Sequence, residues 1–160
     1  MIALKAAWLI ACIAASAAAI ADDQASTQLD PFAQATHGDP ACAARTPPLL
    51  TPQEAQAEAH ARVERGTRCA MEGKCEPGGA YRRDAEINER VRASIAGERR
   101  FARTSIWLTT SRKWVTLQGC VRDAAQRRSL VEFVRRSPDV ERVFDELTIA
   151  AQRAAPPRQR

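Results

Sequence analysis

The order of apolar patterns between residues 84 and 149 constrains the fold of this chain more than any other feature. Between Asp84, which can cap a helix, and Gly97, which can end one, apolar residues recur at every fourth position. Patterns typical of a strand, a strand, a helix and a strand then follow over residues 106–108, 115–117, 123–137 and 143–149. The order helix, strand, strand, helix, strand predicts a small α+β domain.

The apolar residues of the strands share one parity and should face the helices. The opposite parity carries Trp107 and Trp114 and, in the last strand, Phe144. A turn at residues 111–112 would put Trp107 opposite Thr116, with Trp114 as its diagonal neighbour. We therefore expect Trp107, Trp114 and Phe144 to form one apolar interface patch on the face without helices, a kind of patch that is usually covered or used.

The first residues are typical of a secretory signal peptide. Lys5 precedes an apolar run that ends at Ala21, before two aspartates. Cleavage after Ala21 would remove residues 1–21 and leave a mature, periplasmic chain of 139 residues. In an alternative interpretation the segment ending at Cys12 is a lipobox, and Cys12 becomes a lipidated first residue.

Four cysteines would remain after cleavage, and in an oxidising compartment they predict two disulfides. Cys69 and Cys75 are close enough in sequence to close a small ring. Cys120 has the parity of the tryptophans, so a bridge from Cys42 to Cys120 would draw the N-terminal extension across them. We favour this shielding over use of the patch as a partner or membrane interface. Zinc is the other alternative, but no CxxC pair is present.

The remaining segments differ in composition. Residues 22–50 carry few large apolar side chains, which predicts a disordered linker. Residues 51–66 predict an amphipathic helix with a capping box at Thr51 and an end at Gly66. Residues 67–81 form a loop rich in Cys and Gly, and residues 151–160 a basic tail.

Two motifs resemble the BON domain family of the bacterial envelope. Residues 115–121 read V-T-L-Q-G-C-V, and residues 140–149 read V-E-R-V-F-D-E-L-T-I. The resemblance covers residues 82–150 as a single copy. It implies an αββαβ two-layer sandwich, with two helices packed on one face of a three-stranded mixed sheet. It also implies a periplasmic location, a link to stress response and binding of phospholipid or an envelope assembly.

The sequence departs from the family pattern at four places. The hairpin turn has no glycine, which suggests a longer or less tight hairpin. Asp139, Cys120 and Asp145 replace the residues that are usual in the family. We assign Gly119 a structural role, because a side chain where the strand leaves the sheet would crowd the backbone.

Arginines that lie away from the apolar stripes of the helices, or follow the first helix, are candidates for binding anionic headgroups. They are Arg90, Arg92, Arg99, Arg100, Arg103, Arg128, Arg135 and Arg136. Glutamates interleave with them, so a solvated surface without a ligand is the favoured alternative interpretation.

No catalytic arrangement, metal-binding motif or phosphate-binding glycine loop is recognisable, and we expect neither enzymatic activity nor a cofactor. Without Lys5 the chain carries a net charge of about +4, almost all of it from arginine. Outside the cytosol this charge favours an anionic phospholipid surface or an envelope protein as the partner, and not nucleic acid or a small-molecule substrate. The alternative is a periplasmic protein–protein adaptor with no affinity for lipid.

Overall fold

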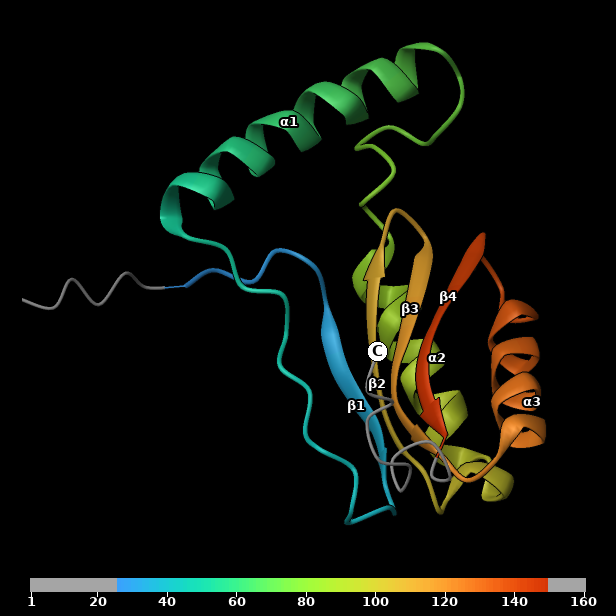
Figure 1. The fold of residues 1–160 in the computed structure, drawn as a ribbon. Coiled ribbons are helices and arrows are strands. Elements are labelled where there is room, and N and C mark those ends of the chain that lie inside the picture. Colours follow the sequence, from blue (N-terminus) through green and yellow to red (C-terminus); the bar gives the residue numbers. More distant parts are fainter. Residues whose placement is uncertain (1–25, 150–160) are drawn as a thin grey trace, which may run out of the picture.

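The computed structural model describes residues 26–149, which form a mixed α+β structure (Figure 1). The predictions for residues 1–21, including Cys12, and for the tail at 151–160 lie outside these residues. The elements in chain order are β1 (Phe32–His37), α1 (Pro52–Met71), α2 (Asp84–Gly97), the short 3-10 helix η1 (Arg99–Phe101), β2 (Ser105–Ser111), β3 (Trp114–Val121), α3 (Ala124–Arg135) and β4 (Arg142–Ile149).

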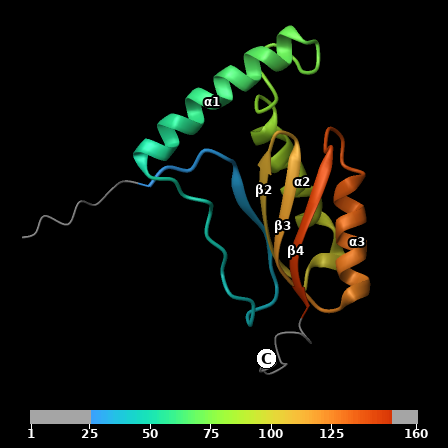
Figure 2. The same cartoon turned by 45° about the horizontal axis from the view of Figure 1, so that its top comes forward.

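The four strands form one mixed sheet in the order β1-β2-β3-β4. The β1–β2 and β2–β3 pairs are antiparallel, and β3–β4 is parallel. Helices α2 and α3 lie on the same face of this sheet, and no helix of the described residues lies across the other face (Figures 1 and 2). The predicted order of elements from α2 to β4 and the packing of two helices on one face are therefore confirmed.

The prediction of a three-stranded sheet is wrong, because β1 adds a fourth strand at the edge of β2. The expected disordered linker over residues 22–50 is wrong at this strand for the same reason. The sequence of β1 has one large apolar side chain, Phe32, and no clear alternation. Its strand conformation comes from pairing with β2, which satisfies backbone groups that would otherwise be open on that edge.

Side chains also hold β1 in place. Ala35 lies in the hydrophobic core, and the Thr36 hydroxyl is 2.8 Å from that of Thr104. At the start of the strand the buried Asn88 side chain of α2 donates to the carbonyl of Pro31 at 2.9 Å. These contacts connect residues more than 50 positions apart, so no local pattern reveals them.

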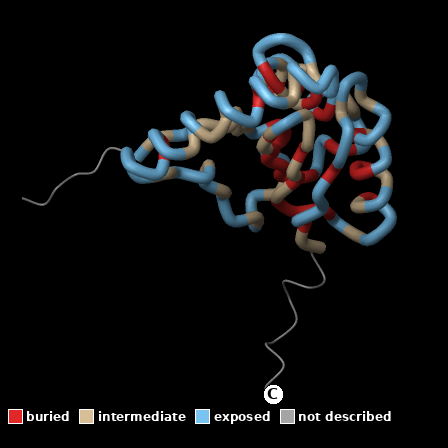
Figure 3. Tube along the Cα trace, turned by 90° about the horizontal axis from the view of Figure 1, so that it is seen from above, coloured by how far each residue is buried: buried red, intermediate tan, exposed pale blue. Residues whose placement is uncertain are grey.

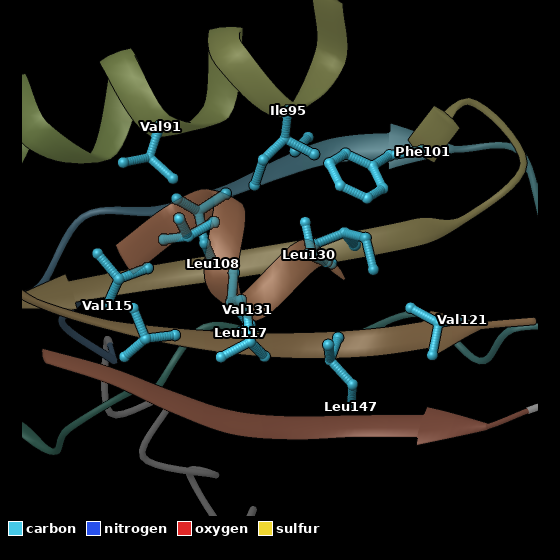
Figure 4. Packing of buried hydrophobic residues seen from close by; sticks show 14 of the residues in the cluster. Val91, Ile95, Phe101, Leu108, Val115, Leu117, Val121, Leu130, Val131 and Leu147 are labelled. Atoms are coloured by element: carbon cyan, nitrogen blue, oxygen red, sulfur yellow. The ribbon is translucent and has the colours of Figure 1, made fainter. Parts of the chain in front are cut away.

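The core lies between the sheet and the two helices (Figure 4). The predicted stripe of α2 contributes Ile87, Val91 and Ile95, all fully buried. Leu130 of α3 and Phe101 of η1 are also fully buried. Each large apolar side chain buried in this way contributes about 1.5–3 kcal/mol, so this layer supplies most of the driving force for folding.

Helix α1 begins as predicted and ends later. The Thr51 side chain accepts a hydrogen bond from the Glu54 amide at 3.3 Å, and the Glu54 carboxylate accepts one from the Thr51 amide at 2.9 Å. The predicted end at Gly66 is wrong, because the helix continues to Met71. Gly66 is buried against Gly79, where a β-carbon on Gly66 would be 3.1 Å from the Gly79 Cα. A close approach of two chain segments thus explains a glycine inside this helix.

One face of α1 connects it to the rest of the molecule. Arg62 makes two hydrogen bonds to the Asp30 carboxylate, at 2.9 and 3.1 Å, and its guanidinium lies 4.4 Å from the Tyr81 ring centroid. Arg65 donates to the Tyr81 hydroxyl at 3.1 Å. Apart from these polar contacts the helix stands away from the sheet and its core (Figures 1 and 3).

Candidate functional site: an aromatic–arginine patch

The β2–β3 hairpin decides which side chains meet on the open face of the sheet. Its turn consists of Arg112 and Lys113, which have φ values of 57° and 62° and make a tight two-residue turn. The predicted turn at residues 111–112 is therefore wrong by one residue, and the expectation of a longer or less tight hairpin is also wrong. Such turns usually need glycine or asparagine, so a specific contact must stabilise this one.

That contact comes from Asp84. Its carboxylate accepts hydrogen bonds from the backbone amides of Arg112, at 2.7 Å, and Lys113, at 2.8 Å. Asp84 is the first residue of α2 and not its cap, which is Arg83. Asp84 as a whole residue is only 3% exposed. Burial raises the pKa of the Asp84 carboxyl, and the hydrogen bonds from the turn amides act in the opposite direction.

The observed register separates the two tryptophans. Trp107 pairs with Gln118, and Trp114 pairs with Ser111, four residues further along β2. This separation is about 13 Å along the strand, so the predicted single patch of Trp107, Trp114 and Phe144 is wrong. Trp107 is only 7% exposed and does not contribute to an open surface.

Trp114 and Phe144 nevertheless lie together. Their ring centroids are 5.9 Å apart, with the planes at 68°, an edge-to-face arrangement. The Arg112 guanidinium lies 4.6 Å from the Trp114 ring centroid, and that of Arg142 lies 5.0 Å from it. Phe144 is 40% exposed and Trp114 is half-buried. We call these four residues the aromatic–arginine patch.

The two arginines of the patch carry charge that no carboxylate of residues 26–149 neutralises by an ion pair. Neither Arg112 nor Arg142 makes an ion pair within residues 26–149, whereas the adjacent Lys113 pairs with Glu141 at 3.3 Å. A guanidinium that stacks on an indole keeps its N–H groups available in the ring plane. The patch can therefore offer several donors to an anion beside an exposed aromatic surface.

The arginines that the sequence singled out divide into two groups. Arg90, Arg92, Arg100 and Arg136 make ion pairs, with Glu86 and Asp139, Glu89, Glu98 and Glu132 respectively. The other four make no ion pair within the described part of the chain: Arg99, Arg103, Arg128 and Arg135. The eight therefore do not form a uniform cationic face.

Arg112 and Arg142 were missed by the reasoning from sequence. Each stands two positions before an aromatic residue, as Arg112 before Trp114 and Arg142 before Phe144. Arg142 and Phe144 are two apart on β4 and so share a face, which was the available signal for that pair, whereas Arg112 lies in the turn and follows no strand parity. The turn register was needed to bring the two pairs together.

Both predicted disulfides are present. Cys42 and Cys120 are bonded, with 5.7 Å between their Cα atoms, and Cys69 is bonded to Cys75. The first bridge ties the segment after β1 to the end of β3. Trp114 is six residues from Cys120 along β3, about 20 Å, so the predicted shielding of Trp114 by this bridge is wrong.

Gly119 lies inside β3, opposite Ile106 and Leu147, and has a φ of 117°. A β-carbon at this position would overlap the carbonyl oxygen of Ser105 and lie 3.1 Å from the Trp107 ring. The strand does not leave the sheet at Gly119 but continues to Val121. The glycine therefore allows close packing across the sheet.

Within residues 26–149, no group of three or more His, Cys, Asp or Glu side chains is arranged to hold a metal ion. No helix in that part of the chain is both long and apolar enough to cross a membrane.

A model of a known protein family matches part of the chain. The family model described as the BON domain matches residues 83–151, and curated proteins show no match to the chain. The match begins at the residue before α2, so β1, α1 and the Cys69–Cys75 loop lie outside it. Both disulfides fit an oxidising compartment. The chain thus carries a single BON domain, over residues 83–151.

Proposed function

We propose that this protein is a non-enzymatic, periplasmic binding protein whose BON domain attaches to anionic phospholipid through the aromatic–arginine patch. The BON domain match favours an envelope-associated, phospholipid-binding role. The observation that carries the proposal is the stacking of two arginines, which make no ion pair with the described carboxylates, on a partly exposed aromatic pair.

Each part of the patch suits the surface of a bilayer. Aromatic side chains such as Trp114 are favoured at the level of the lipid headgroups. Each arginine near an anionic membrane contributes about 1 kcal/mol, so Arg112 and Arg142 together would strengthen binding about thirtyfold. The contribution should fall with ionic strength, because exposed charges are screened by salt.

The patch also has the composition of a protein–protein contact, since tryptophan and arginine dominate such contacts. A periplasmic adaptor without lipid affinity is therefore the alternative. The two functions differ in what the purified protein binds when no other protein is present.

Co-sedimentation with vesicles tests the proposal. We expect binding to vesicles that contain phosphatidylglycerol, weaker binding at high salt, and none to pure phosphatidylcholine. Replacing Arg112 and Arg142 by Gln should weaken binding about thirtyfold. The matched control removes the same charge from Arg92 and Arg136, which pair with Glu89 and Glu132.

The control variant should bind within about threefold of the wild-type protein, because its arginines are already neutralised by neighbours. Absence of binding to anionic vesicles at low salt would leave the adaptor function. Equal losses in both variants would show that binding follows overall charge and not the patch.

A further inference from the structure

The outer face of α1, which carries Val63, Thr67 and Met71, is largely exposed. The large apolar side chains of Val63 and Met71 are 68% and 84% exposed. Together with Thr67 they repeat at every fourth position and share one side of the helix. Glu64, Arg68 and Glu72 complete the lining of a shallow groove on this side.

Contacts elsewhere on α1 hold the helix to the molecule. Arg62 and Arg65 contact Asp30 and Tyr81, and Gly66 packs against Gly79. At about 100° per residue, Arg62 and Arg65 lie more than a third of a turn from Thr67, whereas Gly66 lies beside Val63. A groove at Gly66 is lined by Val63, Thr67 and Met71 and by Pro77 and Gly78 of the following loop. Val63 and Met71 nevertheless remain exposed, and Figures 1 and 3 show α1 extending away from the sheet.

The charge of α1 argues against a membrane as the partner of this face. Three glutamates and three arginines lie between Pro52 and Met71, so their formal charges cancel. Helices that lie on anionic membranes have an excess of Lys or Arg on the polar side. A neutral helix with an apolar stripe and charged flanks is typical of a helix–helix contact.

We propose that the outer face of α1 pairs with the same face of a second copy of this chain, in antiparallel orientation, about a two-fold axis beside Thr67. Val63 and Met71 are each four residues, about 6 Å, from Thr67 along the helix axis. The two-fold axis therefore places Val63 of one copy opposite Met71 of the other. The stripe is self-complementary, as an interface with two-fold symmetry requires.

The charged flank of the stripe is self-complementary too. Glu64 lies about 4.5 Å before Thr67 along the axis, and Arg68 about 1.5 Å after it. In the antiparallel pair Glu64 of one copy is offset by about 3 Å from Arg68 of the other, which permits two symmetric ion pairs. Arg68 makes no ion pair in the described residues, and the ion-pair partner of Glu64 there is the exposed His60.

The contact is small, so the dimer should be weak and depend on protein concentration. A seam of two helices buries less surface than the roughly 1,200 Å² or more of a stable interface. Such a dimer would present two BON domains together and could raise the avidity of either for a shared surface. The inference stands on α1 alone and does not depend on the proposed lipid binding.

Sedimentation velocity of the full chain between about 5 and about 200 µM tests the proposal, because this range covers the micromolar dissociation constants of weak dimers. We expect the wild-type protein to change from monomer to dimer over this range. Glu64→Arg places like charges opposite each other at both symmetric positions and should weaken dimerisation at least tenfold. Combining Glu64→Arg with Arg68→Glu restores opposite charges and should return the dimer affinity to within about threefold of the wild-type value.

Glu132→Arg is the matched control, because it makes the same charge change at an exposed site on α3. It should leave dimerisation unchanged, and circular dichroism verifies that every variant is folded. A wild-type protein that stays monomeric throughout would overturn the proposal. A dimer that Glu64→Arg does not weaken, or that the charge exchange does not restore, would also overturn it.

Discussion

At the scale of single residues, Asp84 connects the core of the BON domain to its surface. A tight turn with two positive φ values is normally occupied by glycine or asparagine, and here it contains Arg112 and Lys113. The buried carboxylate satisfies both turn amides and so fixes the register of the hairpin. The same register puts Arg112 over Trp114, so a residue outside the patch determines the geometry of the patch.

Asp84→Ala should therefore lower the free energy of unfolding by about 1–3 kcal/mol, because two backbone donors lose their acceptor. Urea unfolding followed by circular dichroism measures the change. Asp84→Asn retains one acceptor oxygen and should lose less. Equal stability of Asp84→Ala and the wild-type protein would show that the carboxylate does not stabilise the turn.

The raised pKa of Asp84 makes a prediction about pH. A carboxyl whose folded-state pKa lies above its ordinary value of 3.8 binds its proton more tightly in the folded state. Its contribution to stability is complete below pH 3.8 and is lost as the pH rises through the raised value. The stability advantage of wild type over Asp84→Asn should thus be larger at about pH 3 than at about pH 7, in urea titrations at both values. An advantage that grows with pH would contradict this account.

At the scale of elements, the sequence predicted the helices and strands whose own residues show a periodic apolar pattern. The stripe of α2 and the alternation in β2 and β3 each reflect burial on one side. Strand β1 has no such pattern, because pairing with β2 and hydrogen bonds from distant residues determine its conformation. Continuation of α1 through Gly66 likewise depends on Gly79, thirteen residues away.

The two disulfides should differ in their effect on stability. The Cys42–Cys120 bridge spans 78 residues, whereas Cys69–Cys75 spans 6. Loop-closure entropy gives about 4.5 kcal/mol for the long bridge and about 2 kcal/mol for the short one. Replacing each pair by serines and measuring chemical unfolding tests this order. A smaller loss for the long bridge would indicate that β1 and the extension remain in place without it.

Asp145 protects the exposed edge of β4 against pairing with a strand of another molecule. The Asp145 side chain accepts a hydrogen bond from the Leu147 amide at 3.1 Å, and Arg127 pairs with the same carboxylate at 2.7 Å. A satisfied and charged edge is a poor template for another strand. Asp145→Ala should increase aggregation on heating, measured by light scattering. Arg122→Ala breaks a different exposed ion pair, the one with Asp123, and should not increase aggregation.

At the scale of the whole molecule, two surfaces lie outside the core. The aromatic–arginine patch belongs to the BON domain, and the outer face of α1 belongs to the N-terminal extension. The sequence revealed that Trp114 and Phe144 share the open face, because alternation alone gives parity. It did not reveal Arg112 or Arg142 as their neighbours, because that arrangement requires the turn held by Asp84 and the parallel pairing of β4.

Trp114 itself offers the most direct test of the patch. Without residues 1–21 the tryptophans of the chain are Trp107 and Trp114, so Trp107→Phe leaves Trp114 as the single reporter. We predict that phosphatidylglycerol vesicles shift its fluorescence emission to shorter wavelength, and that brominated acyl chains quench it, because the indole enters the headgroup region. Binding that leaves the emission of Trp114 unchanged, or no binding at all, would contradict the central claim.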